Sequence, residues 1–84
     1  MIRLNLAENM IPMQLLARGQ FAEISELVGK PEHVHRLKEL GLNSGTVVEM
    51  VQPGSPCIVR LAGHKLCFRQ SDLMGIFVRA GVSD

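Results

Sequence analysis

The amino-acid sequence predicts a mainly β fold: about five to six short strands curled into a small barrel, with one short α-helix and a single helical turn near the C-terminus. Three observations lead to this prediction. Short runs of β-branched or alternating apolar residues recur along the chain, one stretch has the period of a helix, and glycines and prolines separate the segments. A curled sheet with a helix over one end buries the most surface that such short strands can bury, and it leaves few free edges.

Length and composition narrow the class of protein. With 84 residues the chain has room for one domain, and its core is too small to support a deep catalytic cleft. The 46% of hydrophobic residues indicate a folded globular protein. A formal net charge of +1, with three phenylalanines and no tryptophan or tyrosine, argues against nucleic-acid binding, which combines a basic groove with stacking aromatic rings.

Two further features concern the location of the protein. The sequence has no apolar run near the roughly 18 residues that a spanning helix needs, and its N-terminus lacks the apolar core of a secretory signal. We therefore expect a cytoplasmic protein without direct membrane insertion. The two cysteines, Cys57 and Cys67, are too few for a disulfide scaffold and are expected to stay reduced.

The N-terminal half predicts an extension, a strand and a helix. Residues 1–12 are expected to form an extension that ends at Pro12, and residues 13–84 to form the domain. In the segment QFAEISELV, residues 20–28, the apolar positions alternate and then change phase, which is typical of a strand with a β-bulge. Pro31 then begins a helix of about ten residues, at the first-turn position that proline tolerates.

The helix is expected to pack against the sheet through one apolar side. At about 100° per residue, Val34, Leu37 and Leu40 gather on that side. Gly41 stands where a left-handed cap residue is expected, and Leu42 can fold back onto the last turn of the helix. We expect the three leucines to seal the helix onto the sheet.

The stretch RLKELGLNSGTVVEM, residues 36–50, has two interpretations. Its glycines, Gly41 and Gly45, belong either to a joint between a helix and a strand or to a phosphate-binding loop. A P-loop needs lysine and then serine or threonine after its second glycine, whereas Thr46 and Val47 follow Gly45 here. The joint is therefore favoured, because glycine also meets the need of such a corner for positive φ.

The C-terminal half predicts a hairpin, a helical turn and a last strand. Residues 46–51 read as a strand, and the segments CIVRL and HKLCFR form a hairpin about a two-residue turn at Ala62 and Gly63. The inner face of the hairpin is expected to comprise Cys57, Val59, Leu61, His64, Leu66 and Phe68, and the outer face Ile58, Arg60, Lys65, Cys67 and Arg69. A single helical turn capped by Ser71 and a last strand at residues 76–80 complete the fold.

From about residue 15 to residue 78 the sequence resembles the FeoA family. The most specific part of the resemblance is the segment RL-x-x-LGL-x-x-G, residues 36–45. The other positions that carry it are Gly19, Ala22, Ile24, Val48, Met50, Pro56, Val59, Gly63, Leu66, Phe68, Arg69, Ile76 and Val78. The chain departs from the family in having Ser44 where proline is usual, a shorter loop at residues 53–56, and the extra residues 1–12.

This resemblance implies both a fold and a role. Because members of the family are small SH3-like barrels, an SH3-like barrel is expected here. The resemblance also implies a non-enzymatic accessory protein of bacterial ferrous iron uptake that docks on FeoB, a membrane permease with a cytosolic GTP-binding domain. Whether the chain forms a homo-oligomer is left open. One alternative is a metal-responsive regulatory module, similar to the SH3-like domains of iron-dependent repressors. Another is a peptide- or RNA-binding barrel, against which the few aromatic residues count.

Candidate metal ligands lie on the polar side of the helix. Glu32, His35 and Glu39 fall within about 60° of one another at spacings of three and four residues, so one imidazole and two carboxylates could hold Fe(II), Zn(II) or Mn(II) loosely. A solvated helix face is the favoured interpretation, and no metal site is assigned. We expect that no cofactor is required, and weak or transient Fe(II) or Zn(II) binding stays open.

A second candidate set for a soft metal comprises Cys57, Cys67 and His64. The hairpin register places Cys67 on the face opposite to the other two residues, so thiols with a packing role are favoured over metal ligands. No pattern of nucleophile and base stands out, and no catalytic residue is assigned.

Two surfaces are selected for contact with a partner protein. The first is the polar side of the helix around Arg36 and Glu39. The second is the outer face of the hairpin around Arg60 and Lys65, where basic side chains can meet an acidic partner surface.

Overall fold

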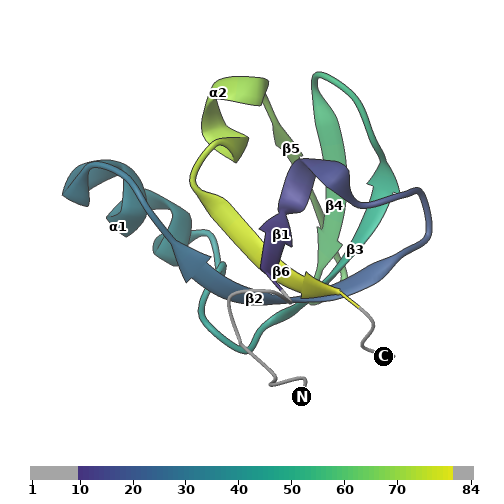
Figure 1. Cartoon of the computed structure of the whole chain (residues 1–84), viewed down its shortest axis with the longest axis horizontal. Helices are drawn as coiled ribbons and strands as arrows, with labels where there is room; N and C mark the ends of the chain where they lie inside the picture. The colour runs from purple at the N-terminus through teal and green to yellow at the C-terminus, as the bar shows by residue number, and fades with distance from the viewer. Residues whose placement is uncertain (1–9, 81–84) are drawn as a thin grey trace, which may run out of the picture.

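One antiparallel sheet of six strands organises the fold (Figure 1). The computed structural model describes residues 10–80, and the strand order is β1-β6-β2-β3-β4-β5. The strands are β1 (Met10–Pro12), β2 (Phe21–Leu27), β3 (Val47–Gln52), β4 (Cys57–Leu61), β5 (His64–Phe68) and β6 (Ile76–Ala80). The helices are the 3-10 turn η2 (Met13–Leu15), α1 (Pro31–Glu39) and α2 (Gln70–Leu73). The predicted mainly β architecture is confirmed.

Strand β1 lies where we expected the end of an extension. It pairs antiparallel with β6, with Met10 opposite Arg79 and Pro12 opposite Phe77, and residues 1–9 of the expected extension lie outside the described residues. Proline is tolerated there because β1 is an edge strand, which needs N–H donors on one side only. Met13, directly after it, is fully buried. Residues 10–12 are therefore part of the sheet.

The core occupies the inner face of the curled sheet. Alternate residues of the strands point into it, as the side-chain period of two requires. The buried residues are Met13, Leu16, Ala22, Ile24, Leu37, Leu42, Val48, Met50, Cys57, Val59, Leu61, Phe68, Leu73, Ile76 and Val78. Because no polar or charged side chain within residues 10–80 is buried with them, apolar burial is the main stabilising term.

The bulge and the hairpin follow the prediction closely. The pairing of β2 with β6 changes register between Ile24 and Glu26, which confirms the bulge. In the hairpin, Leu61 faces His64 across a two-residue turn, and both turn residues have positive φ, 51° for Ala62 and 83° for Gly63. Such a turn matches the twist of the two strands. The predicted inner face is buried except at its end, where Leu66 is half-buried and His64 is exposed.

The joint between α1 and β3 is confirmed, with one difference. Gly41 has φ 105°, and Leu42 folds back so that its N–H donates to the carbonyl of Leu37 at 3.1 Å. Leu37 and Leu42 are buried, but Leu40 is 43% exposed, so the prediction that all three leucines seal the helix is wrong. The reversal of the chain at Gly41 presents Leu42 to the core and turns Leu40 away.

The cap of α2 also differs from the prediction. We expected Ser71 to cap this helical turn, but the helix begins at Gln70 and its N-cap is Arg69. Ser71 therefore lies inside the first turn. The carboxylate of Asp72 takes over the capping contact, because its Oδ2 accepts a hydrogen bond from the N–H of Arg69 at 3.4 Å.

Gly75 joins α2 to β6 at a point where two backbone segments touch. The N–H of Val28 donates to the carbonyl of Gly75 at 2.8 Å. A Cβ atom at Gly75 would lie 1.8 Å from the carbonyl oxygen of Val28. Since backbone atoms cannot give way as a flexible side chain can, only glycine fits this position.

We expect Gly75→Ala to lower the free energy of unfolding by about 3 kcal/mol or more, because the new methyl group overlaps a fixed carbonyl. Urea unfolding followed by circular dichroism measures this loss. The matched control is Gly19→Ala, where an added Cβ meets no atom within 4 Å and only the φ of 82° is unfavourable. Equal losses in the two variants would show that the close approach is not the cause.

Candidate functional site

The outer face of the sheet carries a row of side chains from four neighbouring strands. Phe21 of β2 lies opposite Glu49 of β3. Glu49 lies opposite Arg60 of β4, and Arg60 lies opposite Lys65 of β5. The register that sends the alternate residues, such as Val59, into the core is what places these four on the outer face.

An ion pair occupies the middle of this row. Arg60 Nη1 donates a hydrogen bond to Glu49 Oε1 at 2.6 Å, and the side chains of Arg60 and Glu49 are 42% and 24% exposed. Partial burial screens this pair less than a fully exposed one. A guanidinium has five N–H donors, so the bond to Glu49 leaves most of the Arg60 donors free for another acceptor.

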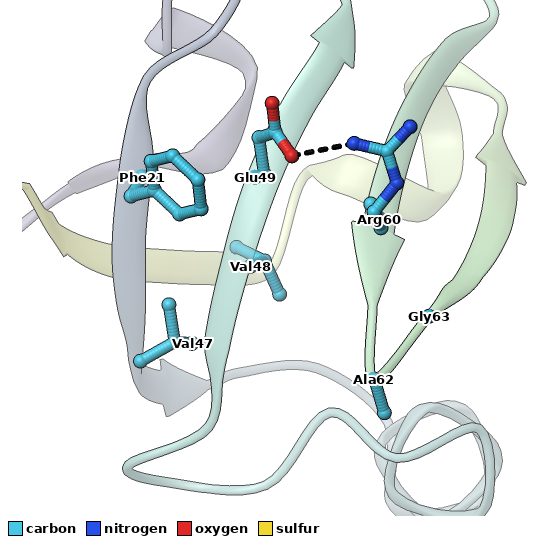
Figure 2. Close-up of a pocket in the computed structure, with 7 residues that line it drawn as sticks. All are labelled: Phe21, Val47, Val48, Glu49, Arg60, Ala62 and Gly63. Atoms are coloured by element: carbon cyan, nitrogen blue, oxygen red, sulfur yellow. Dashed lines mark hydrogen bonds and ion pairs between the residues drawn. The ribbon is translucent and has the colours of Figure 1, made fainter. Parts of the chain in front are cut away.

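A shallow pocket of about 240 Å³ lies beside the ion pair (Figure 2). Phe21, Glu49 and Arg60 stand side by side on their three strands, with Val47 and the Ala62–Gly63 turn below them in this view. The residues that line the pocket are Phe21, Val47, Val48, Glu49, Arg60, Ala62 and Gly63. The pocket is therefore apolar at its base and charged along one side.

A second ion pair flanks the pocket on the same face. Arg79 Nη1 lies 3.3 Å from Glu23 Oε1, across the pairing of β6 with β2. Glu23 in turn lies opposite Val47, which lines the pocket. Arg79 Nε is buried and has no hydrogen-bond partner among the described residues. The outer face thus alternates charged pairs with apolar side chains.

Two other hollows are less well suited to a specific function. One, of about 330 Å³, lies between the start of α1 and α2 and is lined by Lys30, His33, Ser71 and Asp72. The other, of about 350 Å³, is lined by Gln14, Leu15, Gly54, Ser55, Gln70 and Leu73. Both are lined mainly by loops and short turns, whereas regular strands build most of the pocket beside Arg60 and hold its side chains in place.

The polar side of α1 brings together two of the three candidate metal ligands. His35 Nε2 lies 3.1 Å from Glu39 Oε2, one helical turn away, and the side chains are 73% and 66% exposed. Glu32 does not complete a group with them, and across residues 10–80 no three His, Cys, Asp or Glu side chains are placed to hold one metal ion. Arg36, the other partner candidate on this helix, is exposed.

The two thiols lie on opposite faces of the hairpin, as the register predicted. Cys57 is buried and Cys67 is exposed, and both are free. Burial raises the pKa of the Cys57 thiol above its ordinary value of 9.0, and the neighbouring Cys67 raises it further. Cys57 therefore stays protonated and packed in the core, while Cys67 faces solvent on the same side of β5 as Lys65.

We expect a maleimide at neutral pH to modify one thiol per folded chain, at Cys67, because the reactive thiolate of Cys57 is both shielded and disfavoured. Mass spectrometry of the labelled peptides identifies the site. Cys67→Ser should leave the folded protein almost unlabelled, and urea should restore labelling through Cys57. Equal rates at both thiols in the native protein would contradict the packing described for β4.

Sequence analysis predicted part of the geometry of this face, while contact of Arg60 and Lys65 with a partner stays a prediction. It placed these two residues together on the outer face of the hairpin, and the structure confirms that they are direct cross-strand neighbours. It missed Phe21, Val47 and Glu49, because their place beside Arg60 depends on how β2 pairs with β3 and β3 with β4. The alternation in VVEM, residues 47–50, indicates that Glu49 points outward. It does not indicate which strands lie beside this one in the sheet.

The chemistry of the pocket suits binding. Its lining consists of apolar groups and one ion pair, and neither charged side chain adjoins a cysteine, serine or histidine among the lining residues. Such a surface can hold an apolar group next to a charged one. Among residues 10–80, moreover, no helix is long and apolar enough to cross a membrane.

Comparison with known proteins gives a consistent set of matches. A family model described as the FeoA domain matches residues 11–80. No curated protein matches the chain by sequence. Among solved structures, the crystal structure of an iron uptake regulatory protein, FeoA, has a TM-score of 0.80 at 16% identity and covers 86% of this chain and 99% of that chain.

Two further structures agree with this fold. The solution structure of the FeoA protein from Chlorobium tepidum has a TM-score of 0.76 at 28% identity, covering 88% of this chain and 73% of that chain. The zinc complex of FeoA from Stenotrophomonas maltophilia has a TM-score of 0.72 at 23% identity, covering 81% and 88%. That protein is described as an SH3 domain protein and a candidate activating factor of bacterial ferrous iron transport. The fold of the present chain is likewise an SH3-like barrel.

Proposed function

Because the chain belongs to the FeoA family, we propose that it is a non-enzymatic, cytoplasmic accessory protein of bacterial ferrous iron uptake that docks on a FeoB-type permease with a GTP-binding domain. The observation that carries the proposal is the family match over residues 11–80. The names of the structural neighbours, an iron uptake regulatory protein and a candidate transport activating factor, support it.

The surface of the barrel is compatible with docking. Interaction surfaces are enriched in aromatic and arginine side chains, and Phe21 and Arg60 line this pocket together on strands that keep its geometry fixed. Any effect of the protein on transport must come from unequal binding to the states of the permease, since a ligand that binds two states equally shifts neither. The protein would therefore act as a rigid module that favours one state.

We expect the tagged chain to co-purify with the FeoB-type permease from membranes of its own organism, and deletion of its gene to lower uptake of radiolabelled ferrous iron. Re-expression of the chain should restore uptake, because the loss is specific to the module. The control is uptake of a metal ion carried by another transporter. Unchanged ferrous iron uptake in the deletion strain, with no permease in the purified complex, would exclude the proposal.

The second candidate function is a metal-responsive regulatory module. The contact between His35 and Glu39 favours it, because two ligands are already within reach of one ion. The zinc complex of the Stenotrophomonas maltophilia protein is a further reason to test it. Two exposed ligands from one helix turn, however, bind an ion hardly more tightly than water molecules do. Tight sites for such ions use three or four protein ligands.

We expect titration with Zn(II) or Fe(II) under anaerobic conditions to show no saturable binding at micromolar concentrations. We also expect His35→Ala to change the free energy of unfolding by less than about 0.5 kcal/mol, because the pair with Glu39 is solvated. Isothermal titration calorimetry and urea unfolding make the two measurements. Micromolar binding that disappears in both His35→Ala and Glu39→Ala would favour the metal-responsive module instead.

A further inference from the structure

We propose that the pocket beside Arg60 binds an apolar side chain from the cytosolic part of the permease, and that Arg60 and Lys65 bind a carboxylate next to that side chain. The inference rests on the proposed function and adds to it the docking surface and the chemistry of the segment that is recognised. Three features of the outer face support it.

The first feature is the apolar base of the pocket. Val47 is 38% exposed and Phe21 is half-buried, so both present apolar surface to water on the regular part of the sheet. Covering them with an apolar side chain removes this area from water, which is favourable. The volume of about 240 Å³ is below the roughly 300–1,000 Å³ of pockets that enclose small molecules. It suits one side chain of a protein partner.

The second feature is the excess of positive charge along one side. Arg60 uses Nη1 for Glu49, and it makes no other hydrogen bond within the described part of the chain. Lys65, its cross-strand neighbour, is exposed and has no ion pair among residues 10–80. Two neighbouring cations therefore face one carboxylate that pairs with Arg60 alone, and the charge that complements the excess is a second carboxylate.

The third feature is that the charged side is already in place. The bond between Arg60 and Glu49 holds the guanidinium beside the pocket, as Figure 2 shows. A partner that binds there needs to order little of this surface, which lowers the entropic cost of association. An apolar residue adjacent to aspartate or glutamate on an exposed segment of the permease would satisfy both halves of the site.

A second copy of the same chain is the competing occupant. Leu40 is 43% exposed and adjoins Glu39, so α1 itself presents an apolar side chain next to a carboxylate. Glu39 is, however, already in contact with His35 at 3.1 Å, and a neighbouring copy would have to break that contact or share it. Because that contact is solvated and weak, the permease is favoured only as the partner of the proposed function, and the experiment separates the two occupants.

The test measures affinity for the full-length permease in lipid nanodiscs by biolayer interferometry. We expect Arg60→Gln to weaken binding by about tenfold or more, and Val47→Asp, which places a charge in the pocket, to abolish detectable binding. Glu49→Gln should weaken binding less than Arg60→Gln does, because the amide oxygen of glutamine can still accept the hydrogen bond of Arg60 and hold its guanidinium beside the pocket. The matched control, Lys30→Gln at an exposed position just before α1, should bind as wild type does.

Folding of the variants is checked by thermal unfolding. The double variant Glu49→Gln with Arg60→Gln replaces the ion pair by two neutral amides of similar shape, and it should bind as weakly as Arg60→Gln. Lys65→Gln, at an exposed position, measures how much the second positive charge contributes to the affinity for the permease. Wild-type affinity should fall between 50 and 300 mM salt more steeply than that of either charge variant.

Two outcomes overturn the inference, and they are distinguishable. If wild type binds the permease and Arg60→Gln and Val47→Asp bind equally well, the proposed function stands and this docking surface is wrong. If wild type does not bind the permease at all, the proposed function fails and the inference fails with it.

Cross-linking identifies the occupant. Benzophenone-maleimide attached to Cys67, on the outer face beside Lys65, should react with a permease segment that has an aspartate or glutamate next to an apolar residue. Cross-links to α1 of a second copy, lost in Leu40→Ser, would assign the pocket to self-association and contradict the proposal.

Discussion

Two hydrogen bonds at the C-terminus of α1 decide the path of the chain that follows. The N–H of Leu42 donates to the carbonyl of Leu37, and the N–H of Gly41 donates to the carbonyl of Lys38, at 3.1 and 3.0 Å. The turn that they close buries Leu37 and Leu42 together. Gly41 also packs closely, because a Cβ there would lie 3.0 Å from Leu61 Cδ2. This corner therefore connects the helix, the core and the hairpin at one point.

The outer face depends on the same corner. A few residues later, the N–H of Gly45 donates to the carbonyl of Ile24, and the N–H of Ile24 donates to the carbonyl of Thr46, both at 2.8 Å. These bonds start β3 in register with β2, and from that register follow the positions of Glu49 and the neighbouring Arg60. A slip of one residue would turn Glu49 into the core. The surface that we propose for docking is thus a consequence of the packing beneath it.

Local signals were enough to predict much of the fold. The phase change in β2, the two-residue turn of the hairpin and the glycine after α1 each act over a few residues, and each was found. Strand β1 was missed because its partner, β6, lies near the other end of the sequence. Leu40 was misplaced because helical periodicity takes no account of the chain reversal at Gly41. Of the pocket beside Arg60, only the outward position of Arg60 was predicted, since the pocket needs side chains from separate strands whose pairing no local pattern specifies.

Native-state amide hydrogen exchange in Gly41→Ala, compared with wild type, tests this dependence most directly. If the corner sets the register of β3, the variant should lose protection at Ile24, Gly45 and the amides of β3 and β4, by as much as it loses at Leu42. If protection falls only at Gly41 and Leu42, and the sheet exchanges as slowly as before, the corner is a peripheral turn. The outer face would then owe its geometry to the sheet alone.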